Sequence, residues 1–267
     1  MKAVRRAAVI GHPVAHSRSP ELFARFAAAT GIALVYEAVD VAPDDLAATL
    51  ERWRAEPDFV GCNVTLPHKE RALALADRIE PAALACGAAN VLTRENGTLV
   101  AGNTDVAGVE AALAAHGVEL RGARVAILGA GGAARAVAEA ARRNGALRIV
   151  VAARDRLRAQ SVARDFGADA CALGDVPPAD VYVNATPVGM EGHDQRSLLP
   201  LDAVRGAAAF DLVYVPEQTP FLVDARARGL RTVTGTTMFL AQAAATFERW
   251  FGIAPPVAEL AAAKERA

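Results

Sequence analysis

A strand that runs directly into a glycine-rich loop and then into a helix constrains this fold more than any other feature. The apolar run RVAIL is followed at once by GAGGAAR and a long alanine-rich segment. Gly129, Gly131 and Ala134 match the pattern G-x-G-x-x-G/A, whose glycines permit a tight turn and let a pyrophosphate approach the N-terminus of the helix. This context favours a dinucleotide site over a turn that serves packing alone. The predicted cofactor contacts of this loop come from Gly129, Ala130, Gly131, Gly132 and Ala133.

The end of the next predicted strand, RIVVAA, is where such folds distinguish NAD from NADP. NAD-binding versions usually carry Asp or Glu there to hold the ribose hydroxyls, whereas an arginine suits the 2′-phosphate of NADP. The chain has Ala153, Arg154 and Asp155 at this point, and Arg156 and Arg158 can reinforce Arg154. The arginines favour NADP and Asp155 favours NAD, so the pattern predicts NADP with NAD as the less favoured cofactor. The alternative for all these residues is the solvated start of a helix.

Apolar runs alternate with alanine-rich helical patterns along the chain, which predicts an α/β fold with parallel sheets. In the first third, strands are expected at 6–11, 33–39 and 59–66. Ser19 is predicted to cap a helix that ends near Gly31. A hairpin over 88–102, turning at Asn96-Gly97, is expected to add an antiparallel edge.

The alternation starts again after residue 105, which predicts two domains. We expect an N-terminal α/β substrate domain at 1–105 and a Rossmann-type dinucleotide-binding domain at 106–235. The amphipathic segment MFLAQAAATFERWFG predicts a helix that returns to the first domain, so that 236–267 completes it. A cleft between two domains is where a small ligand is expected to bind.

Charge and composition exclude several classes of partner. The formal net charge is -1 and the arginines are scattered among acids, so neither nucleic acid nor a membrane is expected as a partner. The apolar run near the N-terminus is too short for a signal peptide, and no segment is long enough to span a membrane. The cysteines Cys62, Cys86 and Cys171 show no CxxC spacing and are expected to be buried in a reducing cytoplasm.

Two short stretches contain candidate chemistry. In GCNVTLPHK, Asn63 and Thr65 alternate with Val64 and therefore share one strand face, and Lys69 follows. These groups can converge on one small ligand, although a lysine at this point can also simply open a solvated helix. His12 and His16 are four residues apart in an expected loop without a third ligand, so no metal site is predicted.

Several stretches resemble, in order and in approximate spacing, the motifs of the shikimate dehydrogenases. They are HSRSP, NVTLPHK, GAAN, GNTD, GAGGAAR, NATPVGM, YVPEQTPFL and MFLAQA, and together they cover essentially the whole chain. The resemblance implies an oxidoreductase that reversibly reduces 3-dehydroshikimate to shikimate with NADPH, in aromatic amino acid and chorismate biosynthesis.

The resemblance also implies residue roles. The catalytic pair would be Lys69 and Asp105. The substrate carboxylate would be held by Ser17, Ser19 and Tyr214. The ring hydroxyls would be held by Asn63, Thr65, Asn90, Asp105 and Gln242. Further cofactor contacts would come from Thr186, Gly235 and Met238.

Some positions depart from the usual pattern of that family. They are His68, Val106, Ala153, Asp155 and Thr237. A divergent paralogue, a quinate/shikimate dehydrogenase that uses NAD, and a non-catalytic dinucleotide or metabolite sensor therefore stay as alternatives. Two serines suit shikimate better than quinate, and a sensor would not need a proton donor. A monomer or a homodimer is expected.

Overall fold

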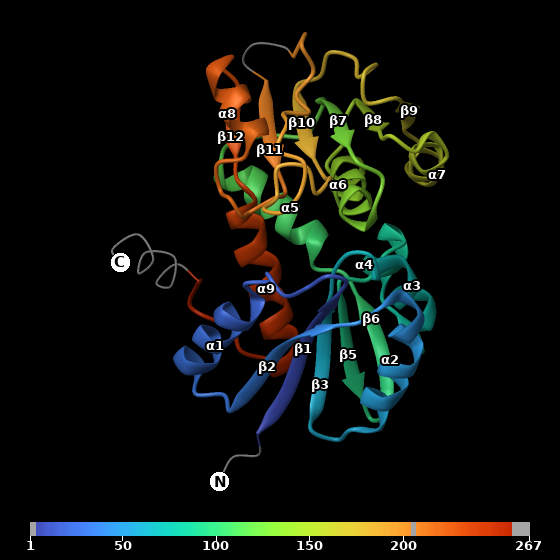
Figure 1. The fold of residues 1–267 in the computed structure, drawn as a ribbon, viewed down its shortest axis with the longest axis vertical. Coiled ribbons are helices and arrows are strands. Elements are labelled where there is room, and N and C mark those ends of the chain that lie inside the picture. The colour runs from blue at the N-terminus through green and yellow to red at the C-terminus, as the bar shows by residue number, and fades with distance from the viewer. Residues whose placement is uncertain (1–3, 204–206, 258–267) are drawn as a thin grey trace. The chain divides into compact units, whose positions relative to one another are not determined.

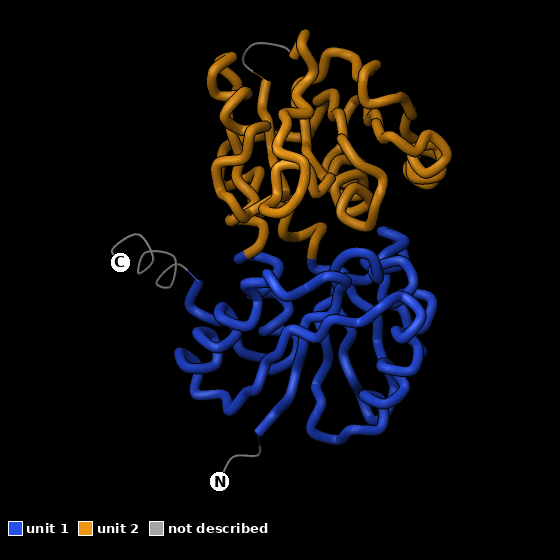
Figure 2. The backbone as a smooth tube through the Cα atoms, in the orientation of Figure 1, with its two compact units in different colours: residues 1–104, 240–267 blue, residues 105–239 orange. Residues whose placement is uncertain are grey.

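The computed structural model describes residues 4–203 and 207–257 of the 267-residue chain. It consists of two compact units, the first formed by Met1–Thr104 with Leu240–Ala267 and the second by Asp105–Phe239 (Figure 2). Each unit has its own six-stranded sheet. The α/β class predicted from the sequence is confirmed.

The sheet of unit 1 is mixed, with the strand order β2-β1-β3-β5-β6-β4 (Figure 1). Its strands are β1 (Arg5–Gly11), β2 (Leu34–Asp40), β3 (Phe59–Val64), β4 (Arg78–Ile79), β5 (Val91–Glu95) and β6 (Thr98–Gly102). β1 is parallel to β2 and to β3, whereas β5 is antiparallel to β3 and to β6. The predicted hairpin is present and turns at Asn96 and Gly97, both with positive φ. The prediction that this hairpin forms an edge of the sheet is wrong, because the two-residue strand β4 pairs with β6 and is itself the edge strand.

Short helices connect the strands of unit 1. They are α1 (Ser19–Thr30), a 3₁₀ turn (Pro43–Asp45), α2 (Leu46–Ala55), α3 (Lys69–Leu75) and α4 (Pro81–Cys86). α1 ends at Gly31, whose φ of 68° is left-handed, as the glycine predicted. The predicted cap is wrong: Arg18 is at the N-cap position and Ser19 is the first helical residue.

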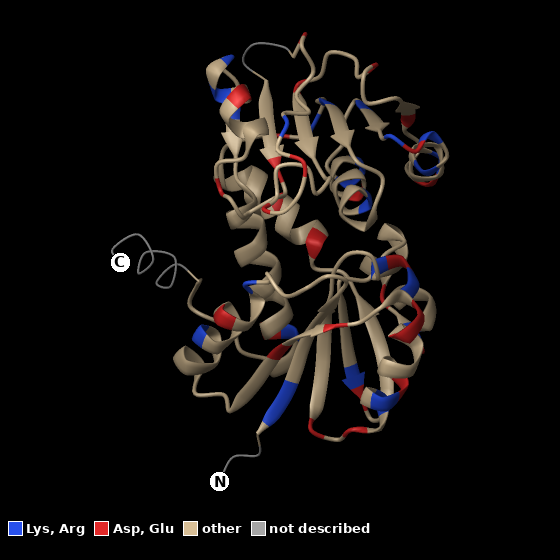
Figure 3. Ribbon diagram, viewed as in Figure 1, with Lys and Arg blue, Asp and Glu red and all other residues tan. Residues whose placement is uncertain are grey.

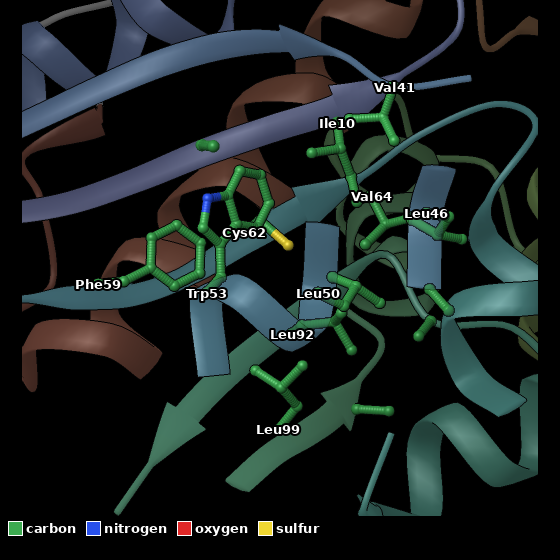
Figure 4. Packing of buried hydrophobic residues seen from close by; sticks show 14 of the residues in the cluster. Ile10, Val41, Leu46, Leu50, Trp53, Phe59, Cys62, Val64, Leu92 and Leu99 are labelled. Carbon is green, nitrogen blue, oxygen red and sulfur yellow. The ribbon is translucent and has the colours of Figure 1, made fainter. Parts of the chain in front are cut away.

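One face of the sheet in unit 1 packs against α2 (Figure 4). Leu46, Leu50 and Trp53 recur at helical spacing and are at most 4% exposed. The Trp53 ring stacks on Phe59 of β3, with 4.6 Å between ring centroids. Ile10 belongs to the same cluster, so the neighbouring buried Val9 faces the other side of the sheet.

Unit 2 has an all-parallel sheet with the strand order β12-β11-β10-β7-β8-β9. Its strands are β7 (Arg124–Leu128), β8 (Arg148–Ala152), β9 (Asp169–Cys171), β10 (Val181–Asn184), β11 (Ala208–Asp211) and β12 (Arg231–Val233). Its helices are α5 (Asp105–Ala115), α6 (Gly132–Arg143), α7 (Arg156–Phe166) and α8 (Pro220–Ala227). Counted from β7, this is the Rossmann order 3-2-1-4-5-6, in which the direction of winding reverses between β7 and β10.

The last helix, α9 (Gly235–Phe251), crosses the boundary between the units after Phe239. Phe247 is fully buried, and its ring lies 6.1 Å from that of Phe23 and 5.6 Å from that of Phe26, both on α1. Arg249 forms a two-pronged ion pair with Glu80 of unit 1. The predicted return of this helix to the first domain is confirmed.

Positively and negatively charged residues are interspersed along the backbone of both units, with Lys and Arg among Asp and Glu (Figure 3). Among the described residues, none of the helices has the length and apolar character needed to cross a membrane. Cys62 and Cys86 are buried, as predicted, whereas Cys171 is only half-buried.

Candidate functional site

The polar end of β3 lies beside β1. Val64 belongs to the apolar cluster under α2, whereas the side chain of Asn63 makes polar contacts instead. The backbone N–H of Thr65 donates to the carbonyl of Ile10 at 2.8 Å, so the pairing with β1 continues past the end of the strand. Asn63 is 7% exposed and Thr65 is half-buried.

Asn63 and Asn90 are held by residues that the sequence did not single out. The Tyr36 hydroxyl donates to Asn63 Oδ1 at 2.8 Å, and Asn63 Nδ2 donates to Thr246 Oγ1 at 3.2 Å. The backbone N–H of Thr104 donates to Asn90 Oδ1 at 2.7 Å. Thr104 lies in the GNTD stretch, but no sequence signal marks Tyr36 or Thr246, and Thr246 is 183 residues from Asn63.

Lys69 is the first residue of α3 and is half-buried. Its carbonyl accepts from the N–H of Ala89 at 2.9 Å, which ties the start of α3 to the segment that carries Asn90. Only three of the 29 Lys and Arg residues of the chain are lysines, and Lys69 is the one in the described part of it.

His68 departs from the family pattern beside this lysine but is a core residue. It is 1% exposed, and its Nε2 donates to the carbonyl of Val41 at 2.7 Å. Its position is therefore explained by packing and one buried hydrogen bond.

The segment between β1 and α1 carries Ser17 and is held by Asp40 at the end of β2. His12 Nδ1 lies 2.6 Å from Asp40 Oδ1, and the N–H of Val14 donates to Asp40 Oδ2 at 3.1 Å. The hydrogen bond from His12 lowers the pKa of Asp40. Ser17 Oγ accepts from the N–H of Ser19 at 3.3 Å, so the two serines lie side by side. Within the described residues, no three His, Cys, Asp or Glu side chains gather as a metal site.

The glycine loop follows β7 at the point where the sheet of unit 2 reverses its winding. Gly129 has a φ of +125°, and a Cβ there would meet the carbonyl oxygen of Ala185 at 2.7 Å. Gly129 is therefore required by the packing of the chain itself. Gly131 is the N-cap of α6, and a Cβ added there would meet no other atom within 4 Å. A glycine that no packing requires, at a helix N-terminus, fits the close approach of a phosphate.

The end of β8 explains the conflicting signals of Arg154 and Asp155. Arg154, Arg156 and Arg158 are exposed, and Ala153 is buried. Asp155 is the N-cap of α7, where its Oδ1 accepts from the N–H of Leu157 at 3.0 Å and of Arg158 at 3.1 Å. The carboxylate that favoured NAD thus has a structural role, the one that Thr or Ser often performs.

The loop after β10 contains Thr186 and folds around Asn184. Asn184 Oδ1 accepts from the Thr186 hydroxyl at 2.7 Å, and Asn184 Nδ2 donates to the carbonyl of Val188 at 2.9 Å. Asp211, at the end of β11, accepts from Asn184 at 3.0 Å and from the Thr219 hydroxyl at 2.6 Å. Burial raises the pKa of Asp211 to about 6 despite these donors.

The start of α9 contributes the remaining candidates. A Cβ on Gly235 would meet the carbonyl oxygens of Leu212 and Val213 at 2.6 Å, so this close approach requires glycine. Tyr214 stacks on Phe239 with 4.3 Å between ring centroids. Met238 is 7% exposed, and Gln242 is half-buried one helical turn before Thr246.

The candidate residues are divided between the two units. Unit 1 holds Ser17, Ser19, Asn63, Thr65, Lys69, Asn90 and Gln242. Unit 2 holds Asp105, Tyr214 and the candidate cofactor residues. Asp105 is the first residue of α5 and is 4% exposed. The structure brings Asn63 and Asn90 into one hydrogen-bonded set, whereas Lys69 and Asp105 belong to different units.

Models of one enzyme family match three parts of the chain. The model described as shikimate dehydrogenase substrate binding domain matches residues 9–92. The model described as shikimate / quinate 5-dehydrogenase matches residues 110–188, and the shikimate 5′-dehydrogenase C-terminal domain matches residues 235–263.

Individual proteins are similar along nearly the whole chain. The shikimate dehydrogenase (NADP(+)) of Mesorhizobium japonicum is 44% identical over 98% of this chain and 96% of its own length. That of Acidiphilium cryptum is 44% identical over 95% of this chain and 92% of its own length. A crystal structure of shikimate 5-dehydrogenase from Thermus thermophilus, in complex with NADP(H) and shikimate, is 39% identical with a TM-score of 0.84. It covers 98% of this chain and 99% of its own.

Proposed function

The chain belongs to the shikimate dehydrogenase family, and from this membership we infer that it catalyses the reversible, NADP-dependent reduction of 3-dehydroshikimate to shikimate. The observation that carries this inference is the relationship along 98% of the chain, which includes both units. A Rossmann order alone would indicate a dinucleotide and leave the substrate open. In this reading, unit 1 supplies most of the substrate-binding residues and unit 2 binds NADP.

Lys69 and Asp105 are the proposed catalytic pair. NADPH, when bound, supplies the hydride. The oxygen of the reduced ketone becomes negative as the reaction proceeds, and the Lys69 ammonium donates a hydrogen bond and then a proton to it. Asp105 orients that ammonium and accepts from a substrate hydroxyl. In the reverse direction, neutral Lys69 takes the proton from the alcohol.

The remaining candidates bind and orient the substrate. Ser17, Ser19 and Tyr214 supply hydroxyl donors that hold a carboxylate without adding a competing charge. Asn63, Thr65, Asn90 and Gln242 hold the ring hydroxyls. The hydrogen bonds that immobilise Asn63 and Asn90 support this role, because a preorganised amide loses little entropy when it binds a hydroxyl.

The residues of unit 2 fit NADP at the carboxyl edge of its sheet. Gly131 leaves room for the pyrophosphate at the N-terminus of α6. Arg154 binds the 2′-phosphate, with Arg158 as a second cation. Ala153, Thr186, Gly235 and Met238 border the rest of the cofactor.

Steady-state kinetics test the proposed function directly. We expect the purified chain to oxidise shikimate with NADP at a kcat/KM at least about tenfold above that with NAD or with quinate. A preference for quinate with NAD would support the alternative dehydrogenase. Dinucleotide binding without turnover of either substrate would indicate a sensor.

The cellular compartment and the oligomeric state of the enzyme are part of the same proposal. The three cysteines, all within the described residues, form no disulfide, which fits a reducing cytoplasm. A monomer or homodimer is proposed, and light scattering of the purified protein measures its mass.

A further inference from the structure

Five polar side chains from five separate segments form one hydrogen-bonded set in unit 1. They are Tyr36 of β2, Asn63 of β3, Asn90 before β5, Thr104 before α5 and Thr246 of α9. Thr246 is fully buried, and its Oγ1 lies 3.2 Å from Thr104 Oγ1. Asn90 Nδ2 donates to that same Thr104 oxygen at 2.9 Å. The set thus links the end of β3 to the residue that immediately precedes Asp105.

The donors of this set can be assigned in one direction from Tyr36 through Asn63 and Thr246 to Thr104. Tyr36 donates to Asn63, and Asn63 donates to Thr246. The Thr104 hydroxyl can donate to Asn90 Oδ1 at 3.3 Å, which leaves the Thr246 proton for Thr104. In a chain of this kind each hydrogen bond polarises the next, and all members hold one another in place.

This arrangement determines what Asn63 can offer to a ligand. Asn63 Nδ2 faces the carbonyl of Asn90 at 3.4 Å as well as Thr246, and because a carbonyl only accepts, the atom that faces it is the nitrogen. Both amide hydrogens are therefore engaged by the protein. The capacity left to Asn63 is the second lone pair of Oδ1, beside the bond from Tyr36.

We propose that Tyr36 and Thr246 are positioning residues that hold the Asn63 amide in the orientation in which its oxygen accepts a hydrogen bond from a ring hydroxyl of the substrate. The proposal rests on the proposed function, because the substrate is the one named there. Neither residue needs to touch the substrate. A flipped amide would place its own oxygen against the Asn90 carbonyl, which can only accept, and the hydroxyls of Tyr36 and Thr246 would have to exchange their donor and acceptor roles.

The test removes one hydroxyl at a time. Tyr36→Phe keeps the ring, which stacks on Phe23 with 4.1 Å between centroids, and Thr246→Val keeps the shape of the side chain. Each change should raise the KM for shikimate about two- to tenfold, the value of one neutral hydrogen bond, with kcat and the KM for NADP within about twofold. Thr246→Ser restores the hydroxyl and should return the KM to within about twofold of the wild type.

Two matched controls separate positioning from general loss of stability. Tyr182→Phe removes a buried phenol hydroxyl from unit 2, where it accepts from the N–H of Ala179. Thr49→Val removes the hydroxyl of a buried threonine on α2. Both should leave the KM for shikimate unchanged, and an equal rise in these controls would overturn the proposal.

A double-mutant cycle with Asn63→Ala gives the sharpest result. Because Tyr36 acts through Asn63, Tyr36→Phe should add no further rise in KM once Asn63 is alanine. An undiminished rise in that background would overturn the proposal. So would wild-type KM values for Tyr36→Phe and Thr246→Val in an enzyme whose wild type oxidises shikimate, and in that case the proposed function would stand. A wild type that does not oxidise shikimate would overturn both.

Discussion

At the scale of single residues, Lys69 is the side chain whose loss should slow turnover most. Lys69→Ala removes the donor to an oxygen that becomes charged only during the reaction, so kcat should fall about a hundred- to thousandfold with little change in substrate affinity. Lys69→Arg should lose nearly as much, because a guanidinium keeps a positive charge but does not release its proton. Steady-state oxidation of shikimate measures both, with the melting temperature as the control for folding. Near-normal turnover of Lys69→Ala would make Lys69 an ordinary helix-start residue.

Arg154 and Asp155 are adjacent residues with opposite expected effects on cofactor choice. Arg154→Ala should raise the KM for NADP roughly ten- to hundredfold and that for NAD much less, because only NADP has the 2′-phosphate. Asp155→Asn keeps an oxygen to cap α7 and removes a negative charge, so it should lower the KM for NADP about two- to fivefold. The measurement is the ratio of kcat/KM values for the two cofactors. Equal losses with both cofactors in Arg154→Ala would remove the assignment to the 2′-phosphate.

At the scale of secondary-structure elements, Arg249 adds polar contacts to the apolar packing of α9 on the rest of unit 1. Arg249 donates to both oxygens of Glu80, at 2.5 and 2.6 Å, and its Nε donates to Thr93 Oγ1 at 2.7 Å. Arg249→Ala should lower the free energy of unfolding by about 1.5–3 kcal/mol, since a two-pronged, partly buried pair is lost. Arg249→Lys should have a free energy of unfolding between those of the wild type and Arg249→Ala, because an ammonium cannot donate to both carboxylate oxygens in the planar geometry of a guanidinium.

Tryptophan fluorescence during urea unfolding measures this effect, since Trp53 and Trp250 both belong to unit 1. Arg25→Ala is the matched control. It breaks an exposed pair with Glu21 one helical turn away and should cost at most about 0.5 kcal/mol. If Arg249→Ala lowers the free energy of unfolding no more than Arg25→Ala does, apolar packing alone holds α9 in unit 1.

At the scale of the whole molecule, Asp211 should make stability depend on pH. The pKa of its carboxyl is about 6 in the folded chain, against an ordinary 3.8. Between these values the folded state binds more protons than the unfolded state. The stabilisation that the protonated Asp211 carboxyl provides is therefore fully present below pH 4 and is lost as the pH rises through 6. Asp211→Asn can keep the same neighbours without a buried charge. It should therefore raise the free energy of unfolding by about 1–3 kcal/mol at pH 7, and this gain should shrink toward pH 4.

Thermal unfolding followed by circular dichroism at pH 4, 5, 6 and 7 checks this dependence. The difference between variant and wild type is the informative quantity, because the other carboxylates titrate in both proteins. A pH-independent difference would show that Asp211 stays ionised throughout this range.

The sequence alone determined the α/β class, the glycine loop and the hairpin turn, and it supplied the candidate site residues as predictions. Each of these depends on local chemistry: the period of apolar residues, the φ angles that glycine permits, or motif letters a few positions apart. Gly129 and Asn96-Gly97 could be read in this way because the chain needs those residues at those turns whatever surrounds them.

Only the tertiary structure decided how distant residues meet. It placed β4 outside the hairpin, and it joined Thr246 to Asn63 across 183 positions and Arg249 to Glu80 across 169. Such contacts leave no periodic trace in the sequence. They arise because buried polar groups must find partners, and which partners are within reach depends on how the elements pack.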